Sequence, residues 1–155
     1  MMIDIVSLQG LEKQKGIDSL VPAQTMKNFK CPKNSEEAKG VSRTKNALVY
    51  LHSYELDNGI CKDLQKNKGA VVFSFRDILE QSGFHRSIML SKMRLALAVC
   101  RKNGTGFVVC SMAKENDEVR SERELEAFMA VLGMNQHEIV HSKNLLEKLI
   151  LETKK

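Results

Sequence analysis

Two histidines and a glutamate have the residue types and the spacing of a zinc-hydrolase helix. His137, Glu138 and His141 spell H-E-x-x-H within the stretch NQHEIVHSK, residues 135–143. In such a helix the two imidazoles lie one turn apart and bind the same Zn²⁺, while the glutamate acts as a base toward the metal-bound water. The pattern makes His137 and His141 candidate metal ligands and makes a zinc metallohydrolase one function that the sequence allows.

The surroundings of this motif favour a structural explanation. Asn135 and Glu138 have the spacing of an N-terminal capping box, in which each side chain accepts a hydrogen bond from the other residue's backbone N–H. Helical periodicity places both histidines on the polar face of the helix. A catalytic zinc would also need a third ligand from upstream, for which the candidates are His52, His85 and Cys110. The sequence therefore predicts a capped surface helix and keeps zinc chemistry as an alternative.

A second set of residues could bind a polyanion. Between Leu64 and Lys102 the chain has eight basic and two acidic residues. Helical periodicity over residues 86–101 separates an arginine- and serine-rich face from an apolar one. The candidate nucleic-acid contacts are Lys66, Lys68, Arg76, Arg86, Ser87, Ser91, Lys92, Arg94, Arg101 and Lys102. The first residues of the helix, Arg86, Ser87 and Ser91, are expected to face bases, and Lys66, Lys68, Arg101 and Lys102 to contact phosphates. The alternative is that these charges only solvate an amphipathic helix.

Composition limits the class of protein. The 155 residues carry a net charge of +5, which is distributed as +2 over residues 1–43, +5 over 44–115 and −2 over 116–155. No window approaches the roughly 18 apolar residues of a membrane span, and the N-terminus lacks the pattern of a secretory signal. The four cysteines, Cys31, Cys61, Cys100 and Cys110, include no C-x-x-C pair. We therefore expect a cytoplasmic protein with free thiols, no cofactor and no membrane partner.

Hydrophobic patterns predict the elements that would position these residues. The runs AVVFSF at 70–75 and GFVVCSM at 106–112 are rich in β-branched residues and predict strands. Ser74 and Asp77 have the spacing of a capping-box variant that opens a short helix through Gln81. Other helices are predicted at 44–57, 86–101, 121–133 and 135–151, and residues 1–42 are predicted to form a flexible arm.

The order helix, strand, short helix, glycine turn, longer helix, strand resembles the winged helix-turn-helix superfamily of DNA-binding domains. The resemblance rests on residues 75–112, FRDILEQSGFHRSIMLSKMRLALAVCRKNGTGFVVCSM. It implies a winged-helix-like basic domain at 43–115. Together with the flexible arm predicted at 1–42 and a helical hairpin predicted at 116–155 from its two apolar-faced helices, this gives a mostly helical α+β fold. The resemblance also implies that the longer helix, residues 86–102, enters the major groove of double-stranded DNA.

The leading hypothesis is a small DNA-binding regulator of transcription that is not an enzyme. Its apolar C-terminal helices could form a homodimer, and its arm could add contacts. The main alternative is a protein-interaction adaptor or inhibitor whose basic face meets an acidic partner. The second alternative is the zinc metallohydrolase.

Overall fold

Parallel β-strands form the centre of the molecule. The computed structural model describes residues 2–7 and 9–153. The strands are β1 (Ile3–Val6), β2 (Ser19–Pro22), β3 (Phe29–Lys30), β4 (Leu48–Val49), β5 (Ala70–Ser74) and β6 (Gly106–Cys110). One sheet has the order β3-β4-β5-β6, β1 pairs with β2, and every pairing is parallel. Beyond β6, Met112 N–H donates to Ile5 O at 2.9 Å and Ser7 N–H donates to Ala113 O at 2.8 Å, so β1 continues the array past β6.

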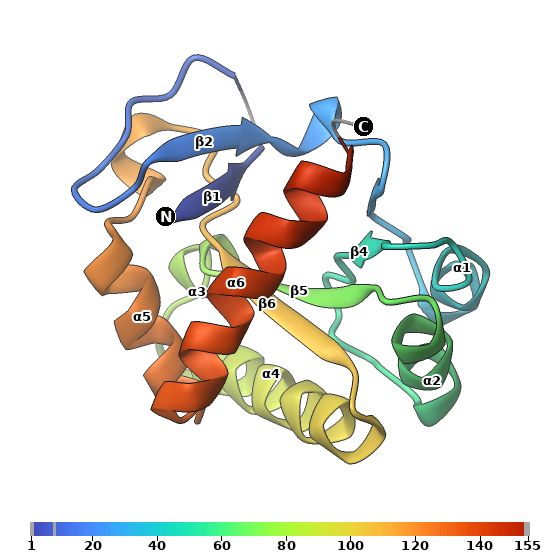
Figure 1. Ribbon diagram of the computed structural model, residues 1–155. Helices are drawn as coiled ribbons and strands as arrows, with labels where there is room; N and C mark the ends of the chain where they lie inside the picture. Colours follow the sequence, from blue (N-terminus) through green and yellow to red (C-terminus); the bar gives the residue numbers. More distant parts are fainter. Residues whose placement is uncertain (1, 8, 154–155) are drawn as a thin grey trace.

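Helices connect and cover these strands (Figure 1). They are α1 (Ser35–Val41), α2 (Asn58–Lys66), α3 (Arg76–Leu79), α4 (Gly83–Asn103), α5 (Glu122–Val131) and α6 (Gln136–Thr153), with 3₁₀ turns η1 (Ala23–Thr25) and η2 (Asn116–Glu118). Helix α2 lies between β4 and β5 in the chain, and α3 and α4 lie between β5 and β6. Parallel strands need such crossover connections because a short turn cannot return the chain to the same end of the sheet.

The fold is therefore α/β and resembles part of a (β/α) barrel, and the winged-helix prediction was wrong. A wing requires an antiparallel hairpin after the recognition helix, but the strand that follows α4 runs parallel to β5, with Ala70 opposite Gly106 and Ser74 opposite Cys110. Without a winged-helix fold, residues 86–102 do not form the major-groove recognition helix that the resemblance implied.

The sheet is buried on both faces. Val71 and Phe73 of β5 belong to a core cluster with side chains of α2, α4 and α5. The alternate residue Val72 belongs to a second cluster, which contains Leu146 and Leu149 of α6. Side chains alternate between the two faces of a strand, so α6 covers one face of the sheet and α2 and α4 cover the other (Figure 1). The apolar face of α6, predicted to dimerise, is buried within the chain's own core.

Several predicted elements are confirmed and others are wrong. Strands β5 and β6 lie where they were predicted, and the helix predicted at 86–101 lies within α4. The helix predicted at 44–57 is absent from the described residues, because this segment contains β4 and a turn in which Tyr54 has a φ of 55°. Residues 1–42, predicted to be a flexible arm, contain β1, β2, β3 and α1, and Ile5 of β1 is fully buried.

Of the two predicted capping pairs, one is confirmed and the other is wrong. Asn135 and Glu138 form the predicted reciprocal capping box, bonded at 2.9 Å in both directions. Ser121 and Glu124 form a second capping box, at the start of α5. Ser74 does not cap α3, since its hydroxyl has no hydrogen-bond partner and Asp77 bonds elsewhere. No helix in the described part of the chain is long and apolar enough to span a membrane.

Candidate nucleic-acid interface

The two C-terminal arginines of α4 are engaged inside the protein. Arg94 donates to the Val131 carbonyl at the end of α5, at 2.8 and 3.2 Å. Arg101 forms a two-point ion pair with Glu138 of α6, at 2.7 and 2.8 Å, and donates to Gly133 O at 2.7 Å. Both guanidinium groups therefore fasten α4 to the segment that connects α5 and α6.

Arg76 and Arg86 also have internal partners. Arg76 forms ion pairs with Glu80 and Glu118. Arg86 donates its Nε–H to the carbonyls of Ile78 and Gln81 at the end of α3. The four arginines proposed as nucleic-acid contacts thus stabilise helix ends and connections. The other predicted contacts on α4, Ser87, Ser91, Lys92 and Lys102, are exposed.

Three of the predicted lysines lie at the amino-terminal edge of the sheet. Lys66 ends α2, Lys68 precedes β5, and Lys102 lies in the last turn of α4 before β6. Because β5 and β6 are parallel, their amino ends meet at one edge. All three side chains are exposed, and within residues 2–7 and 9–153 none forms a salt bridge. The fold therefore gathers cations from positions more than 30 residues apart in sequence.

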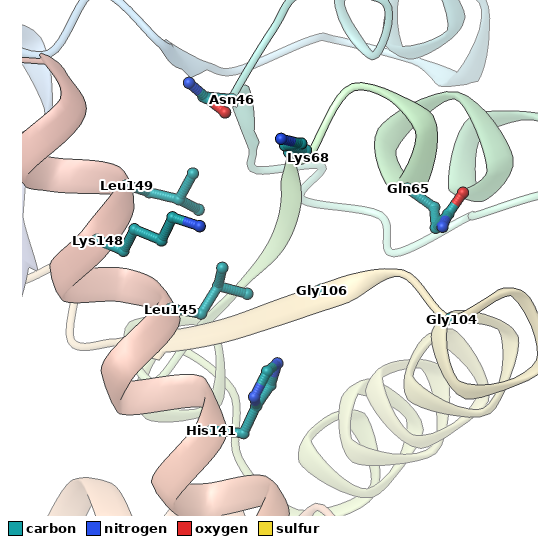
Figure 2. A pocket seen from close by; sticks show the side chains of 10 residues that line it. Asn46, Gln65, Lys68, Gly104, Gly106, His141, Leu145, Lys148 and Leu149 are labelled. Carbon is teal, nitrogen blue, oxygen red and sulfur yellow. The ribbon is translucent and has the colours of Figure 1, made fainter.

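The sequence did not assign a role in nucleic-acid binding to α6. Lys148 and His141 reach from α6 into a hollow at the same edge, opposite Lys68 (Figure 2). The available signal was the helical periodicity of residues 137–148, which places both side chains on the polar face of α6. That signal could not show that this face would meet the amino ends of β5 and β6.

The opposite, carboxyl-terminal edge is organised around buried carboxyl groups. Asp77 accepts hydrogen bonds from the hydroxyls of Tyr54 at 2.6 Å and Tyr50 at 2.7 Å, and His52 Nδ1 lies 3.0 Å from it. Burial raises the pKa of Asp77 although these hydroxyls oppose the shift. All of these partners lie in the loop that follows β4. The carboxyl group of Asp77 therefore holds this loop against the end of β5.

A second buried carboxyl group joins β1 to the end of β6. Asp4 accepts from the backbone N–H and the hydroxyl of Ser111, at 2.7 and 2.5 Å. Burial raises the pKa of Asp4 to about 6, and the bonds from Ser111 oppose the rise. This pair closes the junction between the two groups of strands.

The H-E-x-x-H stretch serves the fold. His137 and His141 are exposed, and Glu138 is bound to Arg101 and to the Asn135 amide. Arg101 holds the pKa of Glu138 below its usual range. No group of three possible metal ligands occurs among the residues that the structure describes. The glutamate is thus a helix cap and an ion-pair partner rather than a base facing a metal.

Comparisons with known proteins point to a different class from the one predicted. The chain is 28% identical over 107 residues to ribonuclease P protein component 3 of Methanosarcina mazei, a match that covers 69% of this chain and 45% of the relative. It also superposes on a chain from a cryo-EM structure of archaeal ribonuclease P with mature tRNA, with a TM-score of 0.55 and 12% identity, over 97% of this chain and 79% of that one. The chain shares the fold of this archaeal ribonuclease P chain. No protein-family profile matches it.

These findings overturn the predicted function. The similarity to a ribonuclease P component and the shared fold contradict a winged-helix regulator of transcription that binds double-stranded DNA. They do not favour an adaptor that binds an acidic protein or a zinc metallohydrolase. The chain spans less than half the length of its curated relative.

Proposed function

We propose that this chain is an RNA-binding protein component of a ribonuclease P ribonucleoprotein, which acts in tRNA processing. The observation that carries the proposal is the sequence similarity to ribonuclease P protein component 3 over 69% of the chain. The fold comparison supports it independently, since it extends over 97% of the chain at a TM-score of 0.55. The match covers only 45% of that relative. Membership of the same kind of assembly is therefore proposed for a chain that corresponds to less than half of the relative.

The basic amino-terminal edge of the sheet is the proposed RNA-binding face. Lys66, Lys68 and Lys102 are exposed and are available to contact phosphates. Lysines in the last turn of a helix also stabilise its C-terminal dipole, which accounts for part of the placement of Lys66 and Lys102. Lys68 directly follows the C-cap of α2 and donates its backbone N–H to the Gln65 carbonyl, so the same dipole accounts for part of its placement too. Ser91 and Lys92 are also exposed on α4, but Lys92 lines a separate hollow with Tyr54 of the loop that follows β4, so they lie away from this edge.

In this proposal the chain supplies contacts and the assembled particle supplies catalysis. The carboxyl groups of Asp77 and Asp4 hold loops and strands together through several donors each, which suits a structural role. The thiols of Cys61, Cys100 and Cys110 are free and buried, as suits a protein of the reducing cytoplasm. RNA and the other protein components of the particle would replace double-stranded DNA as partners.

A binding measurement with the purified full chain tests the proposal. We expect the chain to bind the ribonuclease P RNA of its own organism more tightly than double-stranded DNA of equal length. The logarithm of affinity should decrease linearly with the logarithm of salt concentration, because phosphate contacts release counterions. Lack of RNA binding, or equal affinity for both nucleic acids, would contradict the proposal.

Variants can locate the binding face in the same assay. Alanine at Lys66, Lys68 and Lys102 together should weaken RNA binding and reduce the salt dependence by roughly 0.7 per lost phosphate contact for single-stranded RNA. A matched control replaces Lys33 and Lys114, two exposed lysines that follow β3 and β6 at the opposite edge. If the control weakens binding as much as the triple variant, the amino-terminal edge is not the RNA-binding face.

A further inference from the structure

A small hollow lies between α6 and the amino-terminal edge of β5 and β6. Its lining includes Lys68, Lys148 and His141, the amides of Asn46 and Gln65, and the glycines Gly69, Gly104 and Gly106. Figure 2 shows Lys148 and His141 extending from α6 toward the strand ends, with Lys68 on the other side. The hollow therefore brings together cations from two elements that are distant in sequence.

The lining has the chemistry of an anion site. Two ammonium groups, an imidazole and two amides can all donate hydrogen bonds, and the lining contains no carboxylate. Neither Lys68 nor Lys148 forms a salt bridge within the described ranges. The adjoining hollow, which shares Gly104, Gly106 and His141, contains Glu138 together with its partner Arg101. Uncompensated positive charge thus distinguishes the first hollow from the adjoining one.

Close packing of the backbone shapes the hollow. A Cβ on Gly106 would lie 2.6 Å from Leu145 Cδ2 and 3.2 Å from the Gly69 carbonyl, so glycine allows α6 to approach β6. Gly104 ends α4 in the left-handed conformation, with a φ of 65°. The strand ends therefore present backbone rather than side chains to the space between Lys68 and His141. A bulkier residue at either glycine would change the distance between α6 and the sheet or the end of α4.

The size of the hollow selects a small ligand. Its volume is about 190 Å³, below the roughly 300–1,000 Å³ typical of pockets for whole organic ligands. A single tetrahedral oxyanion is small enough for such a space and can accept several hydrogen bonds at once. Lysine binds phosphate as a point charge without a fixed orientation. The hollow can therefore hold a phosphate whose strand continues in different directions on either side.

We propose that this hollow binds one phosphate group of an RNA backbone, held by Lys68 and Lys148 with His141 as a third donor. This inference rests on the proposed function, because it takes the phosphate from RNA. It gives the H-E-x-x-H stretch a second use, in which Glu138 fastens α6 to α4 while His141, one turn further on, faces the ligand. It also assigns a binding role to α6, which the sequence alone did not indicate.

A double-mutant cycle with single-stranded RNA tests whether one phosphate is shared. Lys68→Ala and Lys148→Ala should each weaken binding several-fold at low salt, and Lys33→Ala should match the wild type. Since both lysines contact the same phosphate, the double variant should bind more tightly than the product of the two single effects predicts. Circular dichroism and thermal unfolding of each variant verify that the exposed substitutions preserve the fold.

The outcomes separate this inference from the proposed function. If the wild type binds RNA but the two lysine effects multiply independently, or equal that of Lys33→Ala, the shared site is refuted and the proposed function stands. If the wild type does not bind RNA, the proposed function fails. Phosphorus NMR then decides the site with inorganic phosphate as the probe. Line broadening with the wild type that Lys148→Ala abolishes supports an oxyanion site, and equal spectra refute it.

Discussion

The pair formed by Glu138 and Arg101 gives a quantitative test of why the H-E-x-x-H spelling occurs. Glu138→Ala removes the bond that the Asn135 backbone N–H donates to the carboxylate, at 2.9 Å. Loss of a helix cap typically costs about 1 kcal/mol. The same change removes the two-point contact with Arg101, whose side chain is 42% exposed. Because solvent screens this ion pair, its contribution to stability is about 1 kcal/mol, the upper end of the range for exposed pairs.

The two contributions give a loss of about 2 kcal/mol in the free energy of unfolding. For a chain of this length, this corresponds to a decrease in Tm of roughly 4–8 °C. Urea denaturation followed by circular dichroism measures the first quantity, and a thermal scan measures the second. Glu138→Gln should lose about half as much, because its amide oxygen can still accept the Asn135 bond.

His141→Ala and Glu147→Ala are the matched controls on the same helix. His141 is exposed and forms no hydrogen bond within the described residues, so its loss should change stability by less than about 0.5 kcal/mol. A metal site would reverse this order, because removing a ligand would abolish stabilisation by added zinc. If His141→Ala destabilises the protein as much as Glu138→Ala does, or if Glu138→Ala leaves the urea midpoint unchanged, Glu138 is not a stabilising cap and ion-pair partner.

Three further perturbations follow from the buried groups. Asp4 has its pKa raised from 3.8 to about 6 by burial, so its contribution to stability is complete below the unfolded pKa and is lost as pH rises through about 6. Relative to Asp4→Asn, the wild type should therefore gain up to about 3 kcal/mol in urea denaturation as pH decreases from about 7 to 4. Asp77→Ala should cost about 2–4 kcal/mol at neutral pH, because the buried Tyr54 hydroxyl and that of Tyr50 lose their acceptor, and a loss below about 1 kcal/mol would refute this role. Gly106→Ala should cost about 1 kcal/mol, because the Leu145 side chain can move away but the Gly69 backbone carbonyl, 3.2 Å from the added Cβ, cannot, with unchanged thermal stability as the contrary result.

The sequence was sufficient to locate β5, β6 and α4 but not to pair the strands. Val71, Val72 and Phe73 are all buried, although neighbouring residues of a strand point to opposite faces. A run that is apolar on both faces is typical of a parallel sheet covered by helices. The helix between the two runs was a further signal for a crossover connection. The strands of an antiparallel wing face solvent on one side, so they would instead show alternating apolar and polar residues.

Other errors came from spacings that fit two structures. Residues 47, 48, 51 and 54 have helical spacing, yet Leu48 is in β4 and Tyr54 lies in a turn with positive φ. Leu48 is buried within the sheet, and Tyr54 is buried with its hydroxyl bonded to Asp77. Tertiary contacts therefore decided the backbone conformation of this segment.

The candidate site illustrates a limit on reading charge from sequence. Lys66, Lys68 and Lys102 lie at one edge because parallel strands align their amino ends, which requires the topology. Arg94 and Arg101 seemed equally available, but their partners Val131 and Glu138 each lie 37 positions further along the chain. Periodicity reveals which face of a helix is polar, and it does not reveal which polar groups another part of the chain will engage.

The position of α6 has a consequence for how the protein is made. Its side chains Leu146, Leu149 and Ile150 complete a cluster that includes Ile3 and Ile5, so the first strand and this helix must both be present before that face is covered. After β6 has been synthesised, about 40 residues remain before α6 ends, which takes roughly 2–8 s at 5–20 residues per second. During that interval the nascent chain exposes an apolar sheet face. We expect the chain to bind chaperones and to aggregate more readily in that state, and both tendencies should end when α6 emerges from the ribosome.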